Sequence, residues 1–184
     1  VALEFTQEDG SCIESLVFKE DGRLFAGDMQ GKVYEVDIEK ESFRELFMAE
    51  RSVGCMDFSG DTLMAVGYDR LYLYDLQEDM LLPQDGTVDT FIRQALMGEA
   101  VSYTGGGYPL AVSGSEEEDV IYLACRNGMY RHVLGGSVME QVIDGALSTL
   151  GDLSAVIYRV RVLKEQEFLI AYTPSVGLVR YEFD

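Results

Sequence analysis

The chain has 184 residues, of which 47% are hydrophobic, so it is long enough to bury a core without disulfides or metals. It contains 33 acidic and 14 basic residues, and its net charge of −19 argues against binding to nucleic-acid phosphates or to an anionic membrane surface. No apolar run approaches the length of a membrane span. The charge suits a cationic partner or a solvated surface.

The first part of the chain predicts an opening strand followed by a four-stranded blade. Residues 1–6 alternate in polarity with the period of a strand. Three short strands and two tight turns are then predicted between Ser15 and Asp37. The first turn contains Asp21–Gly22, where glycine supplies a positive φ at low steric cost. A fourth strand at 43–48 completes an antiparallel blade over residues 12–48.

A second blade is predicted over 53–82, and a helix follows it at 87–97. In this helix the apolar residues recur at helical spacing, at Val88, Phe91, Ile92, Ala95 and Leu96. Thr87 is placed to cap the start of the helix and Gly98 to end it. We expect the helix to pack onto the outside of the strands through Phe91, Ile92 and Leu96.

Two further blades are predicted, over 109–143 and 157–184. Residues 138–150 fit both a strand and a helix, and the sequence leaves that choice open. The last blade stops after three strands. Residues 1–6 are a candidate for its fourth strand, which would close a ring within a single domain over 1–184. The alternative is that the chain forms part of a larger propeller.

The four blades share a tyrosine in the same register, at Tyr34, Tyr72, Tyr130 and Tyr181. A strand-only repeat of this length indicates propeller blades. We therefore predict an all-β, β-propeller-like fold of about four antiparallel blades with one inserted helix. The alternative is a meandering barrel or sandwich, but unrelated hairpins would not keep the tyrosines in register.

The three cysteines, Cys12, Cys55 and Cys125, are far apart and form no CxxC motif. We expect all of them to be unpaired, and Cys55 and Cys125 to act as small core hydrophobes. The lack of a disulfide framework favours a reducing compartment.

Several stretches resemble a known extracellular family. Residues 126–152, with 167–172 and 179–181, resemble the propeller-like region at the front of large solute-binding proteins of anaerobic Gram-positive bacteria. The motif DGRLFAGDMQGKVYEVD at 21–37 is similar to earlier repeats of that region. In the family, the region precedes a periplasmic-binding-protein-like domain that serves an ABC importer. The resemblance implies an extracellular or cell-surface location and supplies no catalytic residue, while the unpaired cysteines leave a cytoplasmic location open.

The main enzymatic alternative is a metal-dependent, lactonase-like propeller hydrolase, to which DGRLFAGD at 21–28 is also similar. Such enzymes hold an axial metal with Asn, Asp and Glu side chains. This chain has a single Asn, Asn127, and a single His, His132, which argues against a metal site or a catalytic triad. We therefore predict no enzymatic activity, no cofactor and no metal.

Recognition is the function that remains, with a purely structural spacer as a further alternative. In a propeller, the hairpins between second and third strands share one face. Their polar and aromatic side chains suit a carbohydrate or peptide ligand. The sequence thus predicts a non-catalytic binding module that could also contact a protein partner or self-associate through edge strands, without nucleic acid or membrane insertion. The predicted ligand-binding residues are Asp28, Gln30, Tyr68, Asp69, Arg126, Asn127 and Tyr172.

Overall fold

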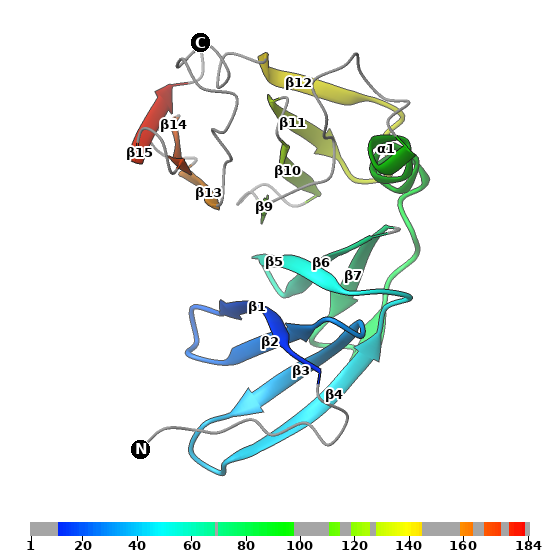
Figure 1. Cartoon of the computed structure of the whole chain (residues 1–184), viewed down its shortest axis with the longest axis vertical. Helices are drawn as coiled ribbons and strands as arrows, with labels where there is room; N and C mark the ends of the chain where they lie inside the picture. The colour runs from blue at the N-terminus through cyan, green and yellow to red at the C-terminus, as the bar shows by residue number, and fades with distance from the viewer. Residues whose placement is uncertain are drawn as a thin grey trace.

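In the part of the chain that the structure describes, the strands pair into four antiparallel sheets, three with four strands and one with three (Figure 1). The computed structural model describes residues 11–68, 70–97, 111–114, 119–125, 128–144, 159–163, 168–173 and 177–182. Within every sheet, strands that are consecutive in sequence are neighbours. The first strands of successive sheets also contact one another, as do the inner strands of a propeller. The predicted all-β, propeller-like fold with an inserted helix is confirmed.

The first two sheets comprise residues 13–81. The first sheet contains β1 (Ile13–Phe18), β2 (Leu24–Asp28), β3 (Lys32–Asp37) and β4 (Ser42–Met48). The second contains β5 (Val53–Ser59), β6 (Thr62–Gly67), β7 (Leu71–Asp75) and β8 (Met80–Leu81).

The other two sheets follow the helix α1 (Gly86–Met97). The third contains β9 (Ala111–Gly114), β10 (Val120–Cys125), β11 (Gly128–Val133) and β12 (Met139–Asp144). The fourth contains β13 (Arg159–Leu163), β14 (Phe168–Thr173) and β15 (Gly177–Glu182). The ambiguous segment therefore begins as the strand β12, and 145–150 lie outside the described residues. Residues 1–6 also lie outside them, so their pairing with the last sheet stays a prediction.

Two of the tyrosines that share a register in the sequence, Tyr72 and Tyr130, pack in the cores between neighbouring sheets. Tyr72 and Tyr74 of β7 stack on Phe47 of β4, with ring centroids 5.7 and 5.4 Å away. Phe25 and Val33 belong to the same buried cluster, which fills the space between the first and second sheets. Tyr130 occupies the equivalent position in the third sheet, in the core that it shares with the second.

Helix α1 packs against the core between the second and third sheets. Val88 and Ile92 are fully buried in that core, and the Phe91 ring lies 4.7 Å from the Tyr130 ring. In Figure 1 the helix lies beside the third sheet, next to β12. The side chain of Leu96 lies outside the described residues. In the part of the chain that the structure describes, no helix is long and apolar enough to cross a membrane.

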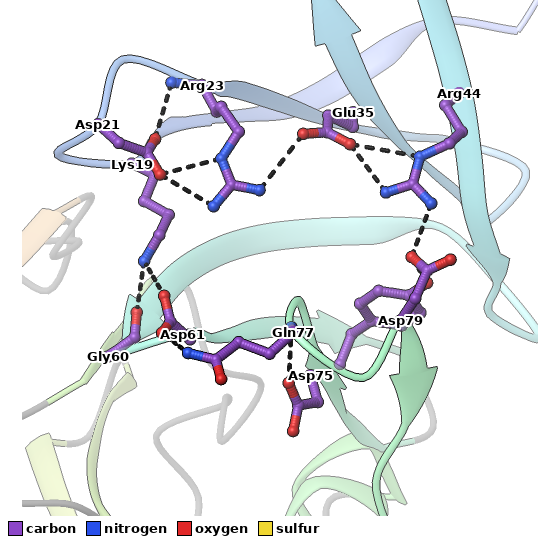
Figure 2. A network of polar contacts seen from close by, with 11 residues as sticks. Lys19, Asp21, Arg23, Glu35, Arg44, Gly60, Asp61, Asp75, Gln77 and Asp79 are labelled. Atoms are coloured by element: carbon purple, nitrogen blue, oxygen red, sulfur yellow. Dashed lines mark hydrogen bonds and ion pairs between the residues drawn. The ribbon is translucent and has the colours of Figure 1, made fainter.

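A polar network joins the first and second sheets at their surface (Figure 2). Lys19 Nζ lies 2.7 Å from Asp61 Oδ1 and donates to the Gly60 carbonyl. Arg44 bridges Glu35 of its own sheet, at 2.9 Å, and Asp79 beyond β7, at 2.6 Å. The hydrogen bond from Arg44 is the main cause that lowers the pKa of Asp79. Lys19 and Arg44 therefore form ion pairs with carboxylates of the protein itself.

Substitution of Gly31 by alanine is expected to destabilise the first sheet. Gly31 has a φ of +96°, and a Cβ there would lie 2.5 Å from the Ala49 carbonyl oxygen. Gly22 is a matched control, because its φ is +89° but a Cβ there would have nothing within 4 Å. Urea unfolding should show a loss of about 1 kcal/mol for Gly22→Ala and clearly more for Gly31→Ala. Equal losses would contradict a steric role for the close approach at Gly31.

Candidate functional site

A hollow of about 440 Å³ lies where the second sheet, α1 and the third sheet meet. Its floor is Leu73 of β7. Its walls are the segment 83–87, which leads into α1, and the turn 134–136, which follows β11. Three of the lining residues are glycines, Gly86, Gly135 and Gly136, and none of the described lining residues is aromatic.

Asp85 fixes both walls of the hollow through one buried carboxylate. Its Oδ1 accepts hydrogen bonds from the amides of Thr87 and Val88, each 3.0 Å long, so Asp85 is the N-cap of α1. Its Oδ2 accepts from the Gly135 amide at 2.7 Å and contacts His132 Nε2 at 2.9 Å. Four donors surround this carboxylate, which fills its accepting capacity.

The cap was predicted at Thr87, and this assignment is wrong because Asp85 supplies the acceptor. The Thr87 side chain instead contacts the opposite wall, where its Oγ1 donates to the Gly136 carbonyl at 2.8 Å. The first turn of α1 is therefore tied to the 134–136 wall twice, once through Asp85 and once through Thr87.

His132 is almost fully buried and is held at both ring nitrogens. Nδ1 lies 2.8 Å from the Val138 carbonyl oxygen, and Nε2 contacts Asp85. Both partners are oxygen atoms of the protein, so both ring nitrogens are engaged within the fold. Because the ring points to protein atoms on both sides, His132 positions the wall of the hollow and offers no nitrogen to a bound molecule.

The pKa of Asp85 reflects two opposing effects. Burial raises it, whereas the hydrogen bonds from the Val88 and Gly135 amides and from His132 lower it. The hydrogen bonds outweigh burial, so the pKa of Asp85 lies below its ordinary value of 3.8 and the group is a carboxylate at neutral pH.

The buried cysteines are poor candidates for chemistry. None of the three cysteines forms a disulfide, as the sequence predicted. Burial raises the pKa of the Cys55 thiol to about 12 and also raises that of Cys125. Both thiols are therefore protonated at neutral pH and weakly nucleophilic. Among the described residues, no group of three or more His, Cys, Asp or Glu side chains is placed to hold a metal ion.

The residues predicted to bind a ligand have different surroundings. Asp28 is fully buried, and its carboxylate accepts from the amides of Gln30 and Lys32 and from the Tyr34 hydroxyl. Gln30 is exposed in the same turn, and Tyr68 is 41% exposed at the end of the second sheet's middle hairpin.

The remaining predicted ligand residues are less completely described. Tyr172 lies in β14, opposite Arg159 and Leu178, and nothing is described of its side chain. Asp69, Arg126 and Asn127 lie outside the described residues. A common ligand-binding face formed by these residues therefore stays a prediction.

Sequence analysis missed the hollow and the Asp85–His132 pair. An Asp directly before a helical stripe is a local N-cap signal, so Asp85 could have been identified. His132 lies 47 positions later in the sequence, in β11 of the third sheet. No local pattern links the two residues, because only the stacking of the second and third sheets brings them together.

No protein-family model and no curated protein matches the chain. Solved structures do match. The computationally designed Ika4 protein is 11% identical, with a TM-score of 0.58, over 100% of this chain and 96% of that chain. The β-propeller domain of Myceliophteria thermophila Cps50 (Swd1) is 12% identical, with a TM-score of 0.61, over 95% of this chain and 54% of that chain.

A third solved structure, the computationally designed Ika8 protein, is 9% identical with a TM-score of 0.57, over 93% of this chain and 46% of that chain. The chain thus spans about half the length of Ika8 and of the Cps50 structure. At these identities the likeness concerns the fold alone. What the comparisons support for this chain is an all-β, β-propeller-like architecture.

Proposed function

We propose that the chain is a non-catalytic binding module that holds an extended peptide in the hollow beside α1. The observation behind this proposal is the hollow itself, whose walls, 83–87 and 134–136, include three glycines and are locked together by Asp85. The glycines leave room for an extended chain, and Leu73 and Leu134 offer apolar surface to its side chains.

The lining favours a peptide over a carbohydrate. Aromatic side chains are common in ligand pockets and give a sugar ring a flat apolar surface, but the lining of this hollow contains none. The net charge of −19 adds a preference for basic peptides, because an acidic protein raises the local concentration of cationic ligands.

The setting we propose is the one that the sequence resemblance suggests. A propeller segment at the front of an extracellular solute-binding protein would present peptides or protein termini near the importer. At this hollow, binding is favoured over catalysis. Both nitrogens of His132 and both carboxylate oxygens of Asp85 already contact protein atoms.

A second candidate ligand surface is the predicted face of the middle hairpins. Its support is the partly exposed ring of Tyr68, which could pack against a sugar or a peptide side chain. A glycan array tests this alternative directly: glycan binding that is lost in Tyr68→Ala and kept in Gly86→Leu would favour the hairpin face over the hollow.

The peptide proposal is tested by fluorescence polarisation with labelled extended peptides of basic, neutral and acidic composition. Gly86→Leu should fill the hollow, because nothing lies within 4 Å of a Cβ at Gly86. We expect the basic peptides to bind wild type and to lose about tenfold in affinity with Gly86→Leu, which corresponds to about 1.4 kcal/mol.

Thr90→Leu is the matched control, since it adds the same side chain to an exposed position on the same helix. It should bind peptides like wild type. Equal affinity of Gly86→Leu and Thr90→Leu would remove the hollow as the site. The absence of binding by any peptide or glycan would favour a structural spacer.

A further inference from the structure

The polar side chains that line the hollow beside α1 have little left to offer a ligand. Both carboxylate oxygens of Asp85 accept hydrogen bonds from the fold, and the Thr87 hydroxyl donates to the Gly136 carbonyl. Gln84, the other polar side chain of the described lining, is exposed and can pair with water. A polar ligand side chain in the hollow would therefore lose its hydration and find few unpaired side-chain partners in exchange.

The apolar part of the lining is aliphatic. Leu73, Pro83 and Leu134 contribute to it. Leu73 belongs to the core between the second and third sheets, and Leu134 packs against that core while remaining half-buried. A hollow of about 440 Å³ lies within the range of about 300–1,000 Å³ that ligand pockets have. An aliphatic side chain placed between Leu73 and Leu134 would therefore extend an existing core.

An exposed acidic residue lies beside this aliphatic wall. The Asp119 carbonyl accepts a hydrogen bond from the Leu134 amide at 2.6 Å, next to the cross-strand pair Val120–Val133. Asp119 is exposed, and its φ of +71° is a conformation that Asp adopts more readily than most residues. The hydrogen bond thus fixes Asp119 next to Leu134, where its negative charge complements a cationic ligand residue.

We propose that the hollow selects a peptide in which a leucine, isoleucine or valine is adjacent to a lysine or arginine. This inference rests on the proposed function and specifies the ligand of the same site. The aliphatic side chain packs between Leu73 and Leu134, and the basic residue pairs with Asp119. The net charge of −19 attracts the base at long range, whereas the hollow recognises the aliphatic side chain on contact. Each methylene removed from water increases affinity about fourfold.

The test is fluorescence polarisation with labelled basic peptides that differ at one position, which is leucine, alanine or asparagine. Asparagine resembles leucine in shape but is polar. We expect wild type to bind the leucine peptide about 10- to 50-fold more tightly than the other two. Leu134→Ala should reduce this preference several-fold and leave affinity for the asparagine peptide nearly unchanged. Val133→Ala is the matched control, because it truncates a neighbouring, exposed aliphatic residue outside the described lining.

Asp119→Asn tests the position of the basic residue. It should weaken the leucine peptide about two- to fivefold at low salt and less at physiological salt, as for an exposed ion pair. The preference for leucine over asparagine should be unchanged, because the hollow itself is intact. Circular dichroism melting checks that each variant is folded, and the comparison of peptides on wild type does not depend on any variant.

Each outcome separates this inference from the peptide proposal. Equal affinity of wild type for the leucine and asparagine peptides, with binding still lost in Gly86→Leu, would overturn the inference and leave the peptide proposal standing. An unchanged preference in Leu134→Ala, or the same loss in Val133→Ala, would also overturn it. Binding by Asp119→Asn at wild-type affinity in low salt would overturn the pairing with Asp119. Failure of every peptide to bind would overturn the proposed function itself.

Discussion

Replacement of Asp85 by alanine is expected to lower the free energy of unfolding by about 3–5 kcal/mol, the usual cost of breaking a buried charged network. The substitution uncaps α1, leaves the Gly135 amide without its acceptor, and removes the partner of His132 Nε2. Urea unfolding followed by circular dichroism measures the loss. Asp37→Ala is the control, because that carboxylate pairs with Lys40 at the surface and its loss should cost far less stability.

The pH dependence of this effect follows from the lowered pKa of Asp85. A carboxyl whose folded pKa lies below its unfolded value of 3.8 stabilises the protein above that value, and the stabilisation disappears as the pH falls through the folded pKa. The stability difference between the wild type and Asp85→Asn should thus be constant at neutral pH and become smaller as the pH falls through the folded pKa of Asp85. Repeating the comparison in a His132→Gln background separates the carboxyl from its ring partner. A difference that persists unchanged into strong acid would contradict this account.

Gly114→Ala is expected to destabilise the chain by about 3 kcal/mol, at the upper end of overpacking effects. A Cβ at Gly114 in β9 would lie 2.1 Å from the carbonyl oxygen of Phe58 and 2.8 Å from the Ser59 Cα. Both are backbone atoms of β5, so no side chain can rotate away to make room. The added methyl group must therefore push the third sheet away from the second.

Thermal unfolding of Gly114→Ala and of Gly86→Ala tests this close approach. Gly86 has nothing within 4 Å of a Cβ and starts a helix, where alanine is favoured over glycine by up to about 1 kcal/mol. Gly86→Ala should melt at or above the wild-type temperature, and Gly114→Ala well below it. Equal melting temperatures of the two variants would show that β9 and β5 can move apart without loss of stability. Relative to the wild type, Gly114→Ala should also show its largest increase in amide hydrogen exchange in β5 and β9.

The fold could be predicted because its signals are local. The alternation around Tyr34, Tyr72 and Tyr130 is visible within single strands, and the stripe of Val88, Phe91 and Ile92 lies within one helix. Each predicts an element without knowledge of its neighbours. The repeat then limits how these elements can stack, so the fold class follows from the sequence.

The candidate site could not be predicted because it depends on contacts between sheets. Asp28 was assigned to a ligand face from its place in a hairpin, yet its oxygens accept hydrogen bonds from residues two, four and six positions later. The hydrogen bonds of Asp85 reach across 47 and 50 positions. A hairpin residue's neighbours can be inferred from turn geometry, but a link of that length is determined only when the second and third sheets pack.

The different environments of the three cysteines give this chain a built-in labelling site. Cys55 and Cys125 are buried with raised pKa values, whereas Cys12 is exposed directly before β1. A maleimide dye added to the folded wild-type protein should therefore attach at Cys12 alone. That dye would report on the environment of the first sheet by fluorescence, without any mutation, and denaturation would reveal the two remaining thiols.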